Sequence, residues 1–158
     1  MSEQLQFVID QIKAIKGPKL VMMIGIPGSG KTTFAEELAR AESYVLCSTD
    51  YLDPRLYKKG RMFERIDQQA RNVVAMGRNI ILDQTNLTRM HREARIANVP
   101  VHYTLIAVDL NGIELDAAIE RVNNRSRRVP ELVIRELFAG YQAPSISEGF
   151  DHIFQVIA

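Results

Sequence analysis

One short segment of the sequence places glycines, a lysine and a threonine at a spacing that suits phosphate binding. Residues 25–32 read Gly-Ile-Pro-Gly-Ser-Gly-Lys-Thr and match the pattern G-x-x-x-x-G-K-[ST] in full. The glycines allow successive backbone N–H groups to converge on anionic oxygens at the start of a helix. Lys31 supplies a positive charge for the β- and γ-phosphates, and the Thr32 hydroxyl can bind Mg²⁺. The segment predicts a nucleoside triphosphate site but does not distinguish ATP from GTP.

Three aspartates follow apolar runs that are typical of buried strands, namely Asp50, Asp83 and Asp109. In an open parallel sheet, ligands bind outside the carboxyl ends of the strands, so these carboxylates are candidate site residues. Asp83 has the placement of a Walker B carboxylate that holds Mg²⁺, with a helix cap or a turn residue as the alternative. Asp50 ends the strand next to the phosphate loop and is the better candidate to accept a proton from an attacking hydroxyl. Asp53 precedes a proline and is interpreted as a turn residue.

A run of arginines lies between two helical patterns near the C-terminus, and comprises Arg121, Arg125, Arg127 and Arg128. Like charges this close repel one another unless they meet anions. We interpret the run as part of a lid that closes on the transferring phosphoryl group and brings at least one guanidinium to the transition state. A solvated surface face is the alternative.

Strand and helix patterns alternate along the chain. Residues 1–18 contain an amphipathic helix that ends at Gly17-Pro18. The remainder, 19–158, shows strand patterns at 20–24, 44–47, 79–83, 101–108 and 152–157. Helical patterns occupy 33–40, 62–76, 86–97, 113–123 and 130–141. The alternation predicts a single α/β domain with a doubly wound parallel sheet, in which residues 113–141 form a helical, Arg-rich lid.

Length and composition narrow the class of protein. A chain of 158 residues is expected to form one domain that binds both nucleotide and acceptor. The net charge of +1 excludes a strongly basic body, so nucleic-acid affinity has to come from local patches. The single Cys47 cannot form an intrachain disulfide and is expected to be a buried apolar residue. No membrane span and no secretory signal are recognised, so a cytoplasmic protein is predicted, with its oligomeric state open.

Four segments together resemble the P-loop kinases related to phage polynucleotide 5′-kinase. They are 25–33, the tripeptide Ser48-Thr49-Asp50, the hexapeptide 82–87 (Leu-Asp-Gln-Thr-Asn-Leu), and the arginine run continuing into Val129-Pro130. The resemblance covers nearly all of the chain after Lys19. It implies a P-loop kinase fold that uses ATP and Mg²⁺.

The resemblance also implies roles for individual residues. Catalysis is assigned to Lys31, to Asp50 as general base, and to Arg125 as the lid arginine. Mg²⁺ is assigned to Thr32 and Asp83. The nucleotide is assigned to Gly25, Pro27, Gly28, Ser29, Gly30, Lys31, Thr32, Thr33 and Arg121. The acceptor is assigned to Asp50, Arg55, Asp83, Thr85 and Asn86.

The chain departs from this family at one position. Polynucleotide kinases carry an arginine three residues after the general base, where it grips an acceptor phosphate, but this chain has Asp53 there and its nearest arginine is Arg55. Lys58, Lys59 and Arg61 could replace that contact. The favoured acceptor is the 5′-hydroxyl of a polynucleotide. The alternatives are a hydroxymethyl group on a modified DNA base and a small hydroxylated metabolite.

A function without turnover is also open. The Asp-Gln-Thr-Asn element at 83–86 is similar to the P-loop domain of heterogeneous nuclear ribonucleoprotein U. That likeness implies a nucleotide- and RNA-binding module. Asp50 discriminates the two classes, because a binding module needs no base beside the phosphate loop.

Overall fold

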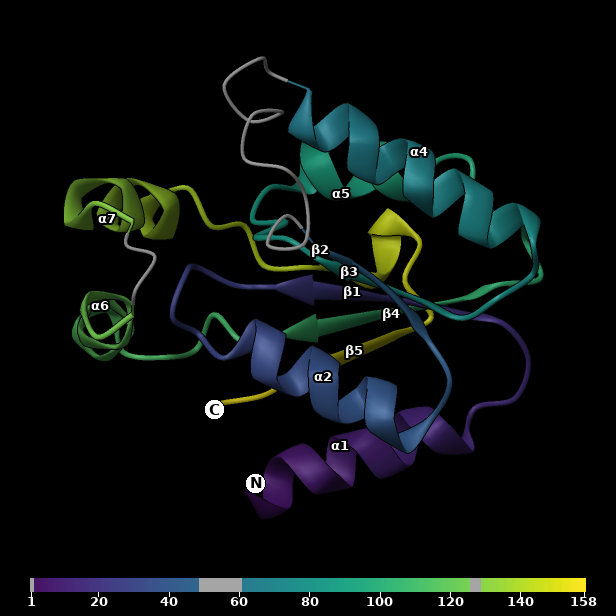
Figure 1. The fold of residues 1–158 in the computed structure, drawn as a ribbon, viewed down its shortest axis with the longest axis horizontal. Coiled ribbons are helices and arrows are strands. Elements are labelled where there is room, and N and C mark those ends of the chain that lie inside the picture. The colour runs from purple at the N-terminus through teal and green to yellow at the C-terminus, as the bar shows by residue number, and fades with distance from the viewer. Residues whose placement is uncertain (1, 49–60, 126–128) are drawn as a thin grey trace.

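The protein is built around a parallel five-stranded sheet with strand order β2-β3-β1-β4-β5. The computed structural model describes residues 2–48, 61–125 and 129–158. Its strands are β1 (Lys19–Ile24), β2 (Val45–Ser48), β3 (Ile80–Asp83), β4 (Thr104–Asp109) and β5 (His152–Gln155). All of them point the same way, so their carboxyl ends share one edge of the sheet (Figure 1).

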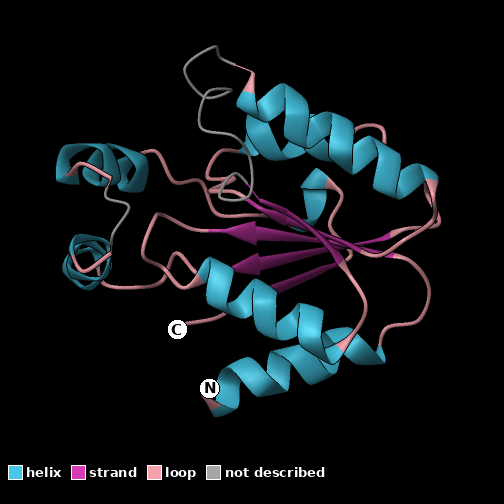
Figure 2. Ribbon diagram, in the orientation of Figure 1, coloured by secondary structure: helices cyan, strands magenta, loops and turns pink. Residues whose placement is uncertain are grey.

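Helices cover both faces of the sheet and extend beyond its carboxyl edge (Figure 2). The pair α1 (Glu3–Ala14) and α2 (Lys31–Ala41) lies on one face, and α4 (Met62–Ala75) and α5 (Arg89–Ile96) lie on the other. The pair α6 (Leu115–Asn123) and α7 (Glu131–Ala139) stands beyond the strand ends, and a 3₁₀ turn, η2 (Ile146–Glu148), precedes β5. In the part of the chain that the structure describes, no helix is long and apolar enough to cross a membrane.

The central strand β1 explains why both faces are covered. All six of its residues are buried, as expected for a parallel strand packed on two sides. Val21 and Met23 join the apolar cluster under α1 and α2, whereas Leu20, Met22 and Ile24 join the cluster under α4 and α5. A third cluster packs α6 and α7 against the loops that follow β1 and β3. The doubly wound parallel sheet predicted from the sequence is confirmed.

The structure corrects two predicted boundaries. The strand predicted from residue 101 begins at Thr104, and Val101 is fully exposed. The helix predicted from residue 86 begins at Arg89, because the Thr88 hydroxyl caps it by accepting a hydrogen bond from the His91 N–H at 3.3 Å. Asn86 instead has a positive φ of 45°, which a helix does not accommodate.

Candidate active site

The phosphate loop joins β1 to α2 and is held by the two loops that flank it. The Gly25 N–H donates to the Thr85 carbonyl at 3.0 Å, from the loop after β3. The Ile26 N–H donates to Asn111 Oδ1 at 3.1 Å, from the loop after β4. The loop therefore has the strand-to-helix context predicted from its sequence, and its backbone is fixed at the carboxyl edge of the sheet.

Two glycines in the loop are required for different reasons. Gly30 precedes the first residue of α2 with φ of 99°, a left-handed conformation that other residues rarely adopt. Gly28 also has a positive φ, 84°, and a Cβ there would lie 2.3 Å from the Ala118 carbonyl oxygen of α6. The first half of α6 therefore packs directly against the phosphate loop at a position that only glycine permits.

The charged and hydroxyl groups of the loop meet the end of β3. Thr32 Oγ1 donates to Asp83 Oδ2 at 2.9 Å, and the Asp83 side chain is almost wholly buried. Lys31 Nζ donates to the Ile26 carbonyl at 3.0 Å, which holds the ammonium over the loop.

A hydroxyl and a carboxylate side by side are hard oxygen donors of the kind that Mg²⁺ accepts. Within the described ranges no group of three or more His, Cys, Asp or Glu side chains could hold a metal ion. A small protein donor set suits Mg²⁺, which usually takes its remaining ligands from substrate phosphates and water. Thr32 and Asp83 therefore fit the metal site predicted for them.

The other predicted nucleotide ligands occupy three environments. Pro27 is half-buried in the loop, and Thr33 is exposed in the first turn of α2. Ser29 is fully buried, and its Oγ has no hydrogen-bond partner within the described residues. A Cβ at Gly25 would lie 2.5 Å from that oxygen. The Ser29 hydroxyl thus faces into the fold beside Gly25.

The predicted acceptor residues Thr85 and Asn86 form part of the support for the phosphate loop. Asn86 is 3% exposed, and its Nδ2 donates to the Met23 carbonyl of β1 at 2.9 Å. Thr85 contributes its carbonyl to the bond with Gly25. The Asn86 amide nitrogen is therefore engaged by the backbone of the central strand, and a direct acceptor contact by Asn86 stays a prediction.

A buried ion pair that the sequence analysis missed fixes this loop from behind. Arg92 of α5 is fully buried, and its Nε and Nη2 donate to Glu148 at 2.7 and 3.1 Å. Its Nη1 donates to the Asn86 carbonyl at 3.0 Å. Burial acts to raise the pKa of Glu148, but hydrogen bonds from Arg92 and Ser145 hold it below its usual range. The pair ties α5 and η2 to the loop after β3.

Asp109, the third predicted carboxylate, belongs to a second support. The Tyr141 hydroxyl donates to Asp109 Oδ2, and the Asn111 N–H donates to Oδ1 at 2.8 Å. Burial raises the pKa of Tyr141, and its bond to Asp109 raises it further, so the hydroxyl keeps its proton. Because Asn111 also accepts from the Ile26 N–H, a chain of hydrogen bonds links the segment after α7 to the phosphate loop.

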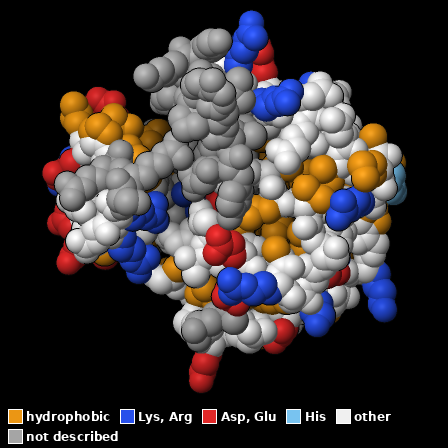
Figure 3. All heavy atoms as spheres, in the orientation of Figure 1, with side chains coloured by type: hydrophobic (Ala, Val, Ile, Leu, Met, Phe, Trp, Pro, Cys, Tyr) orange, Lys and Arg blue, Asp and Glu red, His pale blue; other side chains and the backbone are white. Residues whose placement is uncertain are grey.

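Arg121 of α6 lies at the same edge of the sheet. Arg121 donates to the Gly28 carbonyl at 3.3 Å and to the Ala158 carbonyl at 2.8 Å, which places it beside the phosphate loop as predicted. Arg125 follows the end of α6 and is exposed. Basic side chains gather between α6 and the strand ends in the space-filling view (Figure 3).

Several predicted residues lie outside the described residues. These are Asp50, Asp53, Arg55, Lys58, Lys59, Arg127 and Arg128. Arg61 is described and is exposed immediately before α4. The sole cysteine, Cys47, is buried as predicted, and burial raises its pKa to about 11, so the group is a protonated thiol at neutral pH.

Comparison with known proteins agrees with this geometry. A family model described as an AAA domain matches residues 20–144. A curated relative, the bifunctional polynucleotide phosphatase/kinase of Schizosaccharomyces pombe, is 20% identical over an alignment of 143 residues, and the match covers 87% of this chain. The chain spans only 33% of the length of that relative.

Solved kinase structures share the fold. A fungal RNA kinase matches with a TM-score of 0.67 and 17% identity, over 89% of this chain and 38% of its own. A gluconokinase from Sinorhizobium meliloti 1021 matches with a TM-score of 0.64 and 17% identity, over 90% of this chain and 83% of its own. The chain therefore belongs to the AAA-domain family, is similar in sequence to a polynucleotide phosphatase/kinase and shares its fold with solved kinases.

Proposed function

We propose that this protein is an ATP- and Mg²⁺-dependent kinase that transfers the γ-phosphoryl group to a hydroxyl, with the 5′-hydroxyl of a polynucleotide as the favoured acceptor. One observation carries the proposal. The Thr32–Asp83 hydrogen bond of 2.9 Å joins the phosphate loop to the end of β3, beside Lys31, and Arg121 of α6 donates to the Gly28 carbonyl of the same loop.

Each group has a distinct task in the proposed reaction. Thr32 and Asp83 would hold Mg²⁺, which when bound neutralises phosphate charge. Lys31 and Arg125 would stabilise the charge of the transferring phosphoryl group. Asp50 would accept the proton of the attacking hydroxyl while its oxygen forms the new P–O bond and ADP leaves with the bridging oxygen. Catalysis would rest on positioning and charge neutralisation.

The pair α6 and α7 is proposed as the lid, within residues 113–141 of a kinase domain that spans 19–158. Contact of Ala118 with Gly28 keeps the base of α6 against the phosphate loop, so closure would chiefly move the region around Arg125. Residues 1–18 add a helix that packs on α2 and the sheet. The buried thiol of Cys47 suits a reducing compartment and supports a cytoplasmic location.

A nucleic-acid acceptor is favoured by the names of two related proteins, a polynucleotide phosphatase/kinase and an RNA kinase. Arg61 and Arg65 at the start of α4 are exposed and would add positive charge on the acceptor side. The likeness to a gluconokinase keeps a small hydroxylated metabolite as the second candidate. Salt separates the two, because each acceptor phosphate neutralised by the protein releases counterions, whereas a small metabolite with at most one charge releases far fewer.

The test is transfer of labelled γ-phosphate from ATP, with Mg²⁺, to a panel of acceptors. The panel holds 5′-hydroxyl DNA, 5′-hydroxyl RNA, hydroxymethyl-base DNA and gluconate. We expect label on a 5′-hydroxyl end, with an acceptor KM that rises steeply with salt. Label on gluconate, with a much shallower salt dependence because it carries only one negative charge, would support the metabolite instead. No transfer to any acceptor would support a binding module.

The variant Asp50→Asn sharpens this test. It keeps the size of the side chain but removes the proton acceptor, so single-turnover transfer should fall by about 10²-fold or more. ATP·Mg²⁺ affinity should stay within a few-fold of wild type, because other residues carry it. Equal losses of affinity and transfer would make Asp50 a metal-site carboxylate rather than the base.

A further inference from the structure

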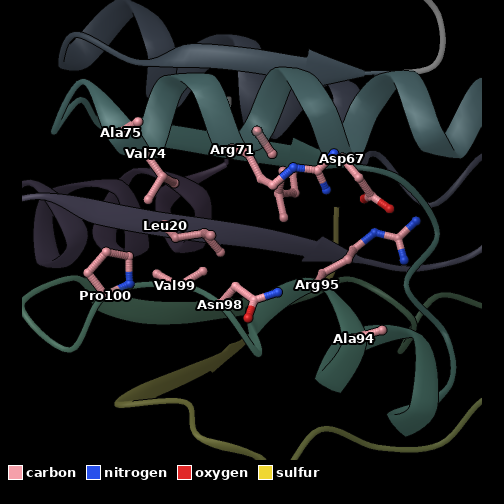
Figure 4. Close-up of a pocket in the computed structure, with 12 residues that line it drawn as sticks. Leu20, Asp67, Arg71, Val74, Ala75, Ala94, Arg95, Asn98, Val99 and Pro100 are labelled. Atoms are coloured by element: carbon pink, nitrogen blue, oxygen red, sulfur yellow. The ribbon is translucent and has the colours of Figure 1, made fainter.

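A cavity of about 290 Å³ lies between α4 and α5, over the face of the sheet that those helices cover (Figure 4). Its floor includes Leu20 and Leu82, and its walls come from α4, from α5 and from the turn that follows α5. Leu20 stands at the beginning of β1, whereas the phosphate loop follows the end of that strand. The cavity is therefore separate from the nucleotide site.

The two ends of the cavity differ in chemistry. Leu20, Val74, Val99 and Pro100 gather at one end, where α4 approaches the turn after α5 (Figure 4). Their side chains offer no hydrogen-bond donor or acceptor. These four side chains suit an apolar group, and the Asn98 amide lies beside Val99 at the border of this end.

The opposite end carries three charges, from Asp67 and Arg71 of α4 and from Arg95 of α5 (Figure 4). Two guanidinium groups against one carboxylate leave a net charge of about +1. A ligand with a single negative charge would balance this end of the cavity.

Arg95 contributes a buried hydrogen-bond donor that has no acceptor in the part of the chain that the structure describes. Its Nε is buried and has no hydrogen-bond partner within the described residues, and Nη1 donates to the His91 carbonyl at 3.3 Å. Its guanidinium carbon lies 5.5 Å from the centroid of the Phe63 ring. Burial lowers the pKa of Arg95, and the nearby Asp67 carboxylate opposes that shift. An anion in the cavity would supply the acceptor that Nε lacks.

We propose that this cavity binds a small amphipathic monoanion, with a carboxylate at Arg95 and Arg71 and an apolar body over Leu20 and Val74. The volume sets the size of the ligand. A buried cavity of about 150 Å³ accepts benzene, so about twice that volume accommodates one ring or a short alkyl chain together with its head group. A guanidinium fork offers a carboxylate two charge-assisted hydrogen bonds.

A ligand in this cavity would affect the active site through α4 and α5, the two helices that form its walls. Helix α4 packs against β3, which ends in Asp83, and α5 carries the Arg92 that donates to the Asn86 carbonyl. A ligand that bridges α4 and α5 would fix the distance between these helices. The cavity is thus proposed as a regulatory site, although its occupancy can be tested without any kinase activity.

The experiment is a titration of the ¹⁵N-labelled full chain with phenylacetate, followed by amide chemical shifts. Phenylacetamide has the same shape without the charge and serves as the matched ligand. For a ligand of about ten non-hydrogen atoms, affinity in about the micromolar to millimolar range is expected. The shifts should saturate and should map to the α4 and α5 residues that line the cavity.

Three variants test whether the ligand carboxylate contacts Arg95. Arg95→Met should lower the affinity for phenylacetate by about tenfold or more, because one charge-assisted hydrogen bond is lost. Arg95→Lys keeps the charge and should recover part of the affinity. Arg40→Met removes an exposed arginine of α2 and should leave binding unchanged.

The proposal is overturned if phenylacetate gives no saturable shifts at the cavity, or if phenylacetamide binds as tightly as phenylacetate. It is also overturned if Arg95→Met and Arg40→Met behave alike. Because the readout is binding at α4 and α5, failure here is distinguishable from failure of the proposed kinase function.

Discussion

Substituting Glu148 by methionine tests how much the buried Arg92–Glu148 ion pair contributes to the free energy of unfolding. In the wild type, Arg92 donates two hydrogen bonds to Glu148, and both side chains are almost wholly buried. Glu148→Met leaves the guanidinium in the interior without its counter-charge. Breaking a buried pair in this way costs about 3–5 kcal/mol of unfolding free energy. For a domain of this size, the melting temperature should fall by about 10 °C or more.

The matched control is the exposed pair Arg89–Glu93. Its N–O distance of 2.6 Å is close to the 2.7 Å of the buried pair, but its side chains are 46% and 47% exposed. Glu93→Met should therefore cost about 0–1 kcal/mol. The comparison isolates burial, because both substitutions remove one carboxylate from an arginine.

The double variant Arg92→Met/Glu148→Met should be more stable than Glu148→Met alone. It leaves no buried charge without a partner. The Asn86 carbonyl still loses the hydrogen bond from Arg92, at a cost of about 1–3 kcal/mol. Urea unfolding of all four proteins measures these differences. If the double variant is no more stable than Glu148→Met, or if Glu148→Met costs no more than Glu93→Met, the pair does not contribute to stability as a buried ion pair.

Acid provides an independent check on the same carboxylate. The folded-state pKa of Glu148 is lowered, so its contribution is complete above the usual range for glutamate and is lost as the pH falls through the folded value. The stability gap between wild type and Glu148→Met should therefore narrow in acid. A gap that stays constant down to the acid transition would contradict the ionised pair.

Three further outcomes test the loop and the proposed lid. Lys31→Ala should abolish phosphoryl transfer but leave the unfolding transition unchanged, because the Lys31 ammonium lies over the loop rather than in a core cluster. Phosphoryl transfer at a near wild-type rate would refute the assignment of Lys31 to catalysis. Arg125→Ala should lower turnover by about 10³-fold, and a loss no larger than that of other exposed arginines would mark it as surface charge. Gly28→Ala should weaken ATP affinity, measured by titration calorimetry, because its Cβ would meet the Ala118 carbonyl; unchanged affinity would show that α6 can move aside.

The parallel α/β fold class, most of the strands and the phosphate loop could be predicted from the sequence because their signals are local, whereas the strand order was not predicted and comes from the structure. Buried parallel strands read as continuous apolar runs, and the loop motif fixes its own strand-to-helix context. Boundaries were less accessible where a cap or turn overrides an apolar pattern, as Thr88 does at α5 and Val101 before β4. The roles assigned to Asp50 and Arg125 stay predictions.

The hydrogen bonds that hold the loops behind the site could not be predicted from local sequence patterns, because they join residues far apart in the sequence. Arg92 lies in a helix dense in arginine, and no role was assigned to any of these arginines from the sequence, yet its spacing from Ile96 places both on the buried face. Glu148 had a local signal that went unused. Ser145 and Glu148 have the spacing of a capping box, which the structure contains. No sequence pattern indicated that these two groups would meet.

The attachment of α6 and α7 at both ends has a consequence for engineering. One end meets the phosphate loop where Ala118 contacts Gly28, and the other returns to the sheet where Tyr141 bonds Asp109. Both anchors lie at the same edge of the sheet, and the third apolar cluster packs the hairpin between them against Ile26 and Leu87. A hairpin from a related domain that keeps these anchors and this packing could be grafted onto the sheet, which would change what the site encloses while the strands stay in register.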